Sequence, residues 1–160
     1  MKSPIASCDI WIDKEGIWYY RGAEMFRRDI VNLFYRHLIK DDSGRYRIEM
    51  DDESCYVDVE DTAFVVKAVY RFEAENGSGD SIYLLLSDDD LEKLEIETLT
   101  ISESNIPYCS VKNRQFEARF SKASYYQLAQ YICHDPDRDA YFISLNGHRH
   151  YLEYTGSRDA

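Results

Sequence analysis

Hydrophobic and polar positions alternate along the first 20 residues in the manner typical of strands. Two β-rich runs, residues 8–13 and 17–20, flank a short turn that contains Gly16, which predicts a β-hairpin. From Met25 to Lys40 the period lengthens, and the chain predicts an amphipathic helix that ends in a turn at Asp41–Gly44. The stripe of this helix comprises Phe26, Ile30, Leu33, Phe34 and His37, with Val31 and Leu38 widening it.

Strands dominate the middle of the chain. Residues 46–50 and 56–59 alternate around an acidic turn, and a longer pair of runs, 64–72 and 82–86, flanks a predicted hairpin loop at Glu75–Asp80. Residues 88–99 predict a short helical turn followed by a strand.

The last third repeats the opening pattern. Residues 108–111 and 115–118 predict a hairpin, and residues 121–133 predict a helix. Residues 141–145 then alternate, and the dipeptide Asn146-Gly147 indicates a two-residue hairpin turn.

A constant shift of 95 residues aligns the two ends of the chain, and a three-residue deletion before the second helix brings Trp18 onto Phe116. The aligned pairs include Ile30 with Tyr125, Leu33 with Leu128, Tyr46 with Tyr141, Ile48 with Ile143, and Tyr56 with Tyr151. We therefore predict an α+β fold made of two degenerate copies of a β-hairpin–helix–β-hairpin unit. The predicted subdomains are residues 1–60 and 106–160, with acidic antiparallel strands at 61–105 between them.

Charge narrows the choice of partners. The net charge is −11, and residues 41–106 carry 19 acidic against 5 basic groups. Such an excess repels phosphate backbones, so we expect no nucleic-acid binding. No apolar run approaches the roughly 20 residues that cross a bilayer, and the first residues lack the apolar stretch of a signal peptide. We therefore expect no membrane contact and a cytoplasmic protein.

Four cysteines, Cys8, Cys55, Cys109 and Cys133, are widely spaced and form no CxxC pair. Zinc sites and redox motifs usually contain close cysteine pairs. In a cytoplasmic chain this spacing predicts reduced thiols, with no disulfide and no bound zinc.

Other reactive groups form no recognisable catalytic or metal motif, so we expect no cofactor. His148 and His150 share one face of a strand, but two ligands do not complete a metal site. Cys133 and His134 are adjacent at a helix end and point in different directions, which disfavours a nucleophile–base pair. The acidic turns at 51–53 and 88–90 lack the ligand spacing of a calcium loop.

Two basic residues at helix starts attract more interest. Arg27 and Lys122 occupy positions related by the shift of 95 residues. The helix dipole disfavours a cation there, whereas the exposed amides attract anions. Either an ion pair with an acidic residue such as Asp61, or a bound organic anion, would explain such a cation.

The chain also resembles a known family in several short motifs. The motifs are Trp18-x-Tyr20-x-Gly22, Met25-x-Arg27-x-x-Ile30-Val31-x-Leu33-Phe34, Val59–Phe64, Glu117-Ala118 and Lys122–Leu128. In this order they are similar to the bacterial domain-of-unknown-function family 1285. Glu24, Ala63 and Ala123 replace prolines of the family pattern, and Lys122 replaces an arginine. Lysine offers a point charge where arginine has a planar guanidinium.

The resemblance implies two similar α+β subdomains, the second like a pleckstrin-homology domain, and a role in signalling through a ligand bound between them. Our leading hypothesis is a non-catalytic binding module for a small anionic ligand or a protein partner. The expected site residues are Arg27, Trp18, Tyr20, Asp61, Lys122, Tyr125 and Tyr126. One alternative is a hydrolase-like enzyme that uses carboxylates with His148 or His150, and another is a structural adaptor whose acidic segment docks a basic partner. The sequence does not choose an oligomeric state.

Overall fold

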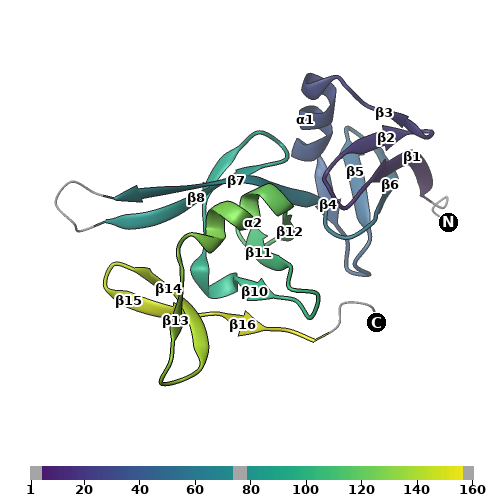
Figure 1. The fold of residues 1–160 in the computed structure, drawn as a ribbon. Coiled ribbons are helices and arrows are strands. Elements are labelled where there is room, and N and C mark those ends of the chain that lie inside the picture. The colour runs from purple at the N-terminus through teal and green to yellow at the C-terminus, as the bar shows by residue number, and fades with distance from the viewer. Residues whose placement is uncertain (1–4, 74–78, 157–160) are drawn as a thin grey trace. The chain divides into compact units, whose positions relative to one another are not determined.

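The computed structural model describes residues 5–73 and 79–156 of the chain. It is an α+β fold, as predicted, and it divides into two compact units, residues 1–63 and 64–160 (Figure 1). Residues 74–78, which hold most of the predicted Glu75–Asp80 loop, lie outside the described part. No helix of the described residues is long and apolar enough to cross a bilayer.

The first unit is one six-stranded sheet with one helix. Its elements are β1 (Ala6–Ile12), β2 (Trp18–Tyr20), β3 (Ala23–Glu24), α1 (Arg28–Arg36), β4 (Leu38–Lys40), β5 (Tyr46–Met50) and β6 (Glu53–Val59). The strand order is β3-β2-β1-β6-β5-β4, and β1 runs parallel to β6 while the other neighbours are antiparallel.

The core of this unit forms around Trp18, which is 1% exposed. Its ring meets the edge of Tyr35 from α1 at a centroid distance of 4.8 Å. The buried Tyr35 hydroxyl donates a 2.8 Å hydrogen bond to the carbonyl oxygen of Ala63. Tyr35 therefore fixes the helix on the unit through both packing and a satisfied polar group.

Both helices are shorter than predicted. The pattern extended the first helix to Lys40, but α1 ends at Arg36 and Leu38–Lys40 pairs with β5. In the same way α2 (Lys122–Ala129) ends before Ile132–Asp135, which pairs with the next strand. A three- or four-residue apolar segment fits either period, and pairing with a neighbouring strand overrides local helical spacing.

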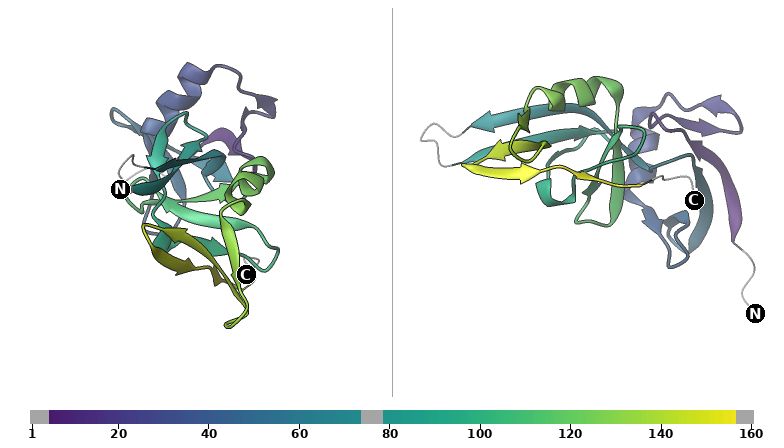
Figure 2. Two further views of the ribbon diagram at one scale, coloured as in Figure 1. Left: turned by 60° about the vertical axis from the view of Figure 1, so that its left-hand side comes forward. Right: turned by 60° about the horizontal axis from the view of Figure 1, so that its bottom comes forward.

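The second unit contains a seven-stranded and a three-stranded sheet. Its strands are β7 (Phe64–Glu73), β8 (Asp80–Leu86), β9 (Leu91–Lys93), β10 (Thr100–Ile101), β11 (Pro107–Val111), β12 (Phe116–Phe120), β13 (Ile132–Asp135), β14 (Ala140–Leu145), β15 (His148–Tyr151) and β16 (Glu153–Tyr154). The larger sheet has the order β16-β10-β11-β12-β7-β8-β9, and the smaller one β13-β14-β15. Helix α2 packs on β7 and β12 (Figure 2). A 3₁₀ helix at Ile96–Thr98 follows β9, which reverses the predicted order of turn and strand at 88–99.

The strand order of the first unit recurs in the second when the two sheets of the second unit are joined through β15 and β16. The first reads β3-β2-β1-β6-β5-β4, and the second reads β12-β11-β10-β16 and then β15-β14-β13. Leu152 alone separates β15 from β16, so these two together occupy the place of β6. The parallel pair β1·β6 has its counterpart in the parallel pair β10·β16. Strands β7 to β9 extend the second sheet beyond β12.

Strand register supports the same correspondence. Ile48 pairs with Cys55, and the residues 95 positions later, Ile143 and His150, also pair. This recurrence favours the predicted duplication, but the opening hairpins do not follow the predicted alignment. Trp18 pairs with Ile12 as Pro107 pairs with Ile101, so Trp18 corresponds to Pro107 and not to Phe116. The link from β11 to β12 is longer than the link from β2 to β3, so the constant shift of 95 residues does not extend to the strands before it.

Candidate functional site

A pocket of about 840 Å³ opens in the first unit, and most of its surface is apolar. It is lined by Cys8, Ile10, Tyr20, Glu24, Met25, Phe26, Arg27, Ile30, Phe34, Ile48, Met50, Glu53, Ser54 and Cys55. These residues come from β1, β2, β3, α1, β5, β6 and the link before α1. The volume lies in the range typical of small-molecule sites.

The pocket uses one apolar stripe of the helix segment. Phe26, Ile30 and Phe34 recur every four residues and line the pocket, and Phe26 is 79% exposed. Val31 and Tyr35 point to a different face and are buried in the core. Three residues of the predicted stripe, Phe26, Ile30 and Phe34, therefore serve the pocket, while Val31 of the same stripe anchors the helix together with Tyr35.

Polar groups in the pocket are few. Arg27 lines it and also makes a 2.6 Å ion pair with Asp29, whose side chain lies outside the pocket. The hydrogen bond from Arg27 lowers the pKa of the Asp29 carboxyl, and the same contact raises the pKa of Arg27. Both side chains are more than 60% exposed, and such surface pairs contribute about 0–1 kcal/mol. A ligand anion can therefore compete for Arg27 at small cost.

Ser54 adds a polar group that no sequence signal indicated. Its hydroxyl oxygen is buried and has no hydrogen-bond partner within the described residues. A buried hydroxyl without a partner costs about 1–3 kcal/mol. Because Ser54 also lines the pocket, a bound ligand with a hydrogen-bonding group would relieve that cost.

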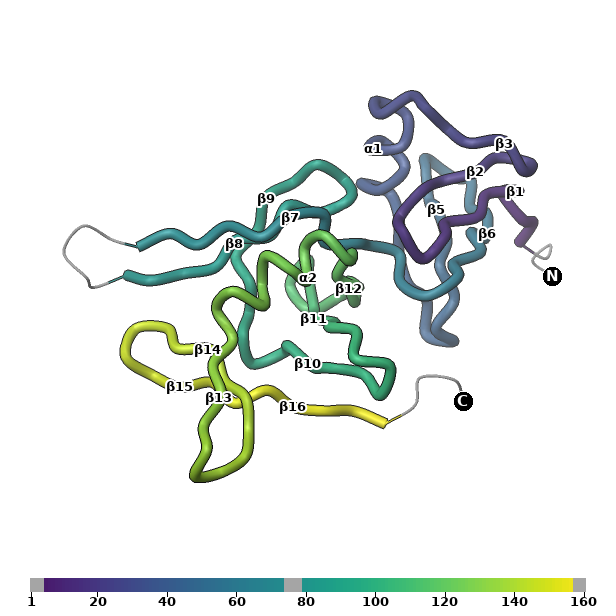
Figure 3. Tube along the Cα trace, in the orientation of Figure 1, coloured from purple at the N-terminus to yellow at the C-terminus, as the bar shows by residue number. Residues whose placement is uncertain are grey.

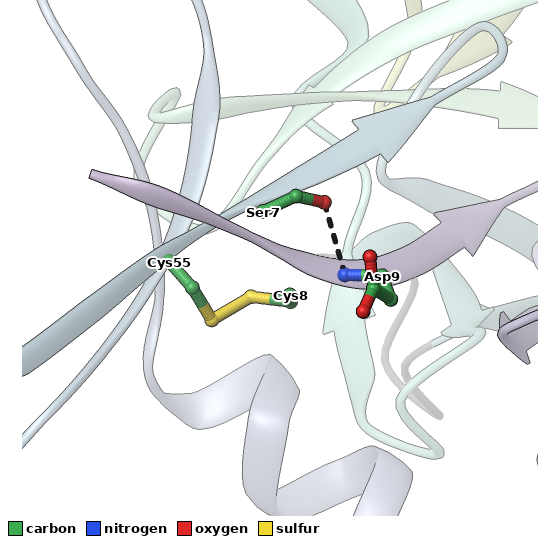
Figure 4. The surroundings of a disulfide bond; sticks show 4 residues. All are labelled: Ser7, Cys8, Asp9 and Cys55. Carbon is green, nitrogen blue, oxygen red and sulfur yellow. Dashed lines mark hydrogen bonds between the residues drawn. A yellow bond between two sulfur atoms is a disulfide. The ribbon is translucent and has the colours of Figure 1, made fainter. Parts of the chain in front are cut away.

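Cys8 and Cys55 form a disulfide in the pocket wall, which corrects the prediction of four reduced thiols (Figure 4). The Cα atoms are 5.0 Å apart, within the usual range for a bridge. The sequence separation of 47 residues hides this proximity, because it arises from the parallel pairing of β1 with β6. A bulge between Ser7 and Ile10, with Asp9 at φ 60°, lies at the position of Cys8.

The two remaining cysteines differ in accessibility. Cys109 is buried, and burial raises the pKa of its thiol far above the ordinary value, whereas Cys133 is exposed. We predict that a non-reducing preparation reacts rapidly with thiol reagent at Cys133 only, and at Cys109 only after denaturation. Two further thiols are expected after reduction. Four reactive thiols in denatured but unreduced protein would contradict the disulfide.

The expected site residues divide between the units. Arg27 and Tyr20 line the pocket of the first unit, where Trp18 belongs to the buried core and does not line the pocket. Asp61 is half-buried on the link between β6 and β7 and has interaction partners. In the second unit Lys122 is exposed at the start of α2, Tyr125 donates a 3.3 Å hydrogen bond to Asn105, and Tyr126 is 66% exposed.

His148 and His150 line a second pocket, of about 820 Å³, in the second unit. Within the described residues, no group of three or more His, Cys, Asp or Glu side chains is arranged to hold a metal ion. The imidazole Nε2 of His134 lies 3.0 Å from a carboxylate oxygen of Asp139. Burial raises the pKa of Glu92, which lines the same pocket as His148 and His150.

Much of the acidic middle segment is neutralised inside the second unit. Lys112 lies 2.7 Å from Asp88 and 2.8 Å from Asp90. The other ion pairs of this segment are Lys67 with Asp89, Arg71 with Asp80, and Arg114 with Glu95. The net charge of the segment therefore overstates the negative surface that is open to a partner.

Comparisons with known proteins bear on the fold. No family model and no curated protein matches the chain. A crystal structure of a DUF1285 family protein from Silicibacter pomeroyi DSS-3 is similar, with a TM-score of 0.75, 19% identity, and coverage of 95% of this chain and 84% of that one. A DUF1285 family protein from Shewanella baltica OS155 aligns with a TM-score of 0.60 and 20% identity over 76% of this chain and 90% of that one. The chain therefore has the fold of DUF1285 family proteins.

Proposed function

We propose that the protein is a non-catalytic binding module whose first unit holds a small organic anion with an apolar body. The observation that carries this proposal is the apolar pocket of about 840 Å³ with Arg27 in its lining. Ligand sites in proteins typically combine apolar walls with a few placed polar groups. Here Arg27, Tyr20 and Ser54 supply the polar groups.

The walls suit a ligand of variable shape. Met25 and Met50 are unbranched and polarizable, so they adapt to irregular apolar surfaces. Glu24 and Glu53 also line the pocket, and they disfavour a ligand with many negative charges. A ligand with an apolar body and a single anionic group therefore suits both the apolar walls and these two carboxylates. Its anion would replace Asp29 as the partner of Arg27.

The test compares two fluorescent probes that share an aromatic body. Anilinonaphthalene sulfonate carries an anion, whereas N-phenylnaphthylamine is neutral. We expect Arg27→Ala to weaken binding of the sulfonate about tenfold or more, since hydrogen bonds to charged groups contribute about 1.5–3 kcal/mol. Binding of the neutral probe should change less than twofold. Fluorescence titration of the folded protein measures both.

Arg28→Ala is the matched control, because Arg28 is the next residue and does not line the pocket. It should leave both probes unaffected, and both variants should keep a near-normal melting temperature. An Arg27→Ala protein that binds both probes like the parent would contradict the proposal. So would an Ile30→Glu protein that retains full affinity for the neutral probe, since Ile30 lies in the apolar lining.

The proposal extends to regulation. Binding in such a module would signal through a second surface, to which Lys122, Tyr125 and Tyr126 of the second unit would contribute. Support for this part comes from the repeat-related positions of Arg27 and Lys122. A cytoplasmic location belongs to the same hypothesis, but the Cys8–Cys55 bridge counts against it, because disulfides persist mainly in oxidising compartments.

A further inference from the structure

The first unit covers a strand edge that the second unit leaves open. In the first unit β1 pairs with β6 from Cys55 to Val59. In the second, the parallel pairing of β10 reaches only Glu153 and Tyr154, which lie 95 positions after Asp58 and Val59. Strand β15 is an edge of its three-stranded sheet, whose path can be followed in Figure 3. No strand of the described residues pairs with β15 in the way that Ala6 and Ser7 pair with β6.

The chain before β10 departs from the path that β1 follows. Ile96–Thr98 form a 3₁₀ helix directly before β10, so this segment cannot extend the parallel pairing towards β15. Leu94 to Glu97 instead form one side of the second pocket, and His148 and His150 of β15 line it as well. The pocket of about 820 Å³ therefore lies against the face of β15 that carries His148 and His150.

The backbone of β15 presents hydrogen-bonding groups along this edge. Leu145 and His148 flank the two-residue turn and pair with each other, as do Ser144 and Arg149. Hydrogen-bonded and non-hydrogen-bonded pairs alternate in an antiparallel ladder, and the pair that flanks a two-residue turn is hydrogen-bonded. The N–H and C=O groups of Arg149 and Tyr151 thus face away from β14, where a further strand would bind.

The charge around the pocket selects the kind of strand. Its carboxylates are Asp80, Glu92, Glu95 and Glu97, and its ammonium groups are Lys93 and Lys112. When their ion-pair partners Arg71, Arg114, Asp88 and Asp90 and the Arg149–Asp135 pair of β15 are included, seven carboxylates stand against five cationic side chains. An excess of two carboxylates therefore remains after the ion pairs are counted, and this residual negative charge complements a basic partner.

From the unpaired edge of β15 and the charge around it, we infer that this edge binds a short, extended, basic segment of a partner protein by strand addition. The open length of β15 is four residues, so the segment adds a short strand whose backbone bonds to Arg149 and Tyr151. Backbone bonds supply affinity in this mode, and alternate side chains supply selectivity. This site is separate from the pocket of the first unit and does not depend on its ligand.

The test uses a capped peptide of alternating lysine and valine and follows backbone amides by NMR. Added peptide should shift the Arg149 and Tyr151 amides and slow their hydrogen exchange. Arg149→Pro removes the outward N–H, and proline is tolerated where an edge N–H faces solvent. Arg149→Ala loses the same contact with Asp135 but keeps that N–H. We expect the proline variant to bind about five- to tenfold more weakly than the alanine variant.

Two peptide controls complete the experiment. A peptide N-methylated at alternate residues should not bind, and a glutamate–valine peptide should bind at least tenfold more weakly. Equal affinity of the proline and alanine variants would overturn the inference, as would the absence of any shift at millimolar peptide. A concentration-dependent dimer of the protein alone, abolished by Arg149→Pro, would assign the edge to a second copy and also overturn it.

Discussion

Replacing Cys8 and Cys55 together by alanine is expected to lower the unfolding free energy of the first unit by about 4 kcal/mol. The bridge closes a loop with a sequence separation of 47 residues, and its removal restores conformational freedom to the unfolded chain. It also releases β1 at its bulge, where strand pairing with β6 is irregular. Urea unfolding of oxidised protein measures the difference.

Treatment with a reductant distinguishes the effect of the disulfide bond on stability from the effect of packing by the two cysteine side chains. Dithiothreitol should destabilise the parent protein by a similar amount and leave the double variant unchanged. The Cys133→Ser variant, which replaces an exposed thiol, should have an unfolding free energy within about 0.5 kcal/mol of that of the parent. A parent protein that is indifferent to dithiothreitol would show that the bridge contributes nothing to stability.

Trp18→Ala is expected to cost about 3–5 kcal/mol, the range for truncation of a buried aromatic side chain. Trp18 is 1% exposed and meets both Phe34 and Tyr35, so its removal leaves a cavity beneath α1. Circular dichroism and the fluorescence of the remaining Trp11 would follow unfolding.

Trp11→Ala is the comparison, since Trp11 is 42% exposed and contacts Tyr19 at the surface. Its loss should cost less than about 1 kcal/mol. If Trp18 instead acted mainly in ligand binding, its variant would unfold like the parent and lose probe affinity, which is the opposite pattern.

Local periodicity was sufficient for the fold class and for most strands. The helices, the β5–β6 hairpin and the Asn146-Gly147 turn all follow from patterns within about 15 residues. The helix ends did not follow, because Leu38–Lys40 and Ile132–Asp135 are decided by pairing with strands further along the chain.

The site was predicted only in part, for a similar reason. Arg27 and Tyr20 were identified from charge and aromatic character, and both line the first-unit pocket. The disulfide and the buried Ser54 hydroxyl depend on the parallel pairing of β1 with β6, which joins segments far apart in sequence. The apolar spacing of Phe26, Ile30 and Phe34 was visible, but an apolar stripe does not reveal whether it faces a core or a pocket.

The positions of the tryptophans and of the exposed cysteine allow energy transfer between the two units to be measured. Both tryptophans of the chain, Trp11 and Trp18, belong to the first unit. With the bridge closed and Cys109 buried, Cys133 in the second unit is the one exposed thiol of the described residues. An acceptor dye attached there would receive excitation energy from the tryptophans without any engineered residue. The efficiency of that transfer, with and without probe in the pocket, would report whether the two units move relative to each other when a ligand binds.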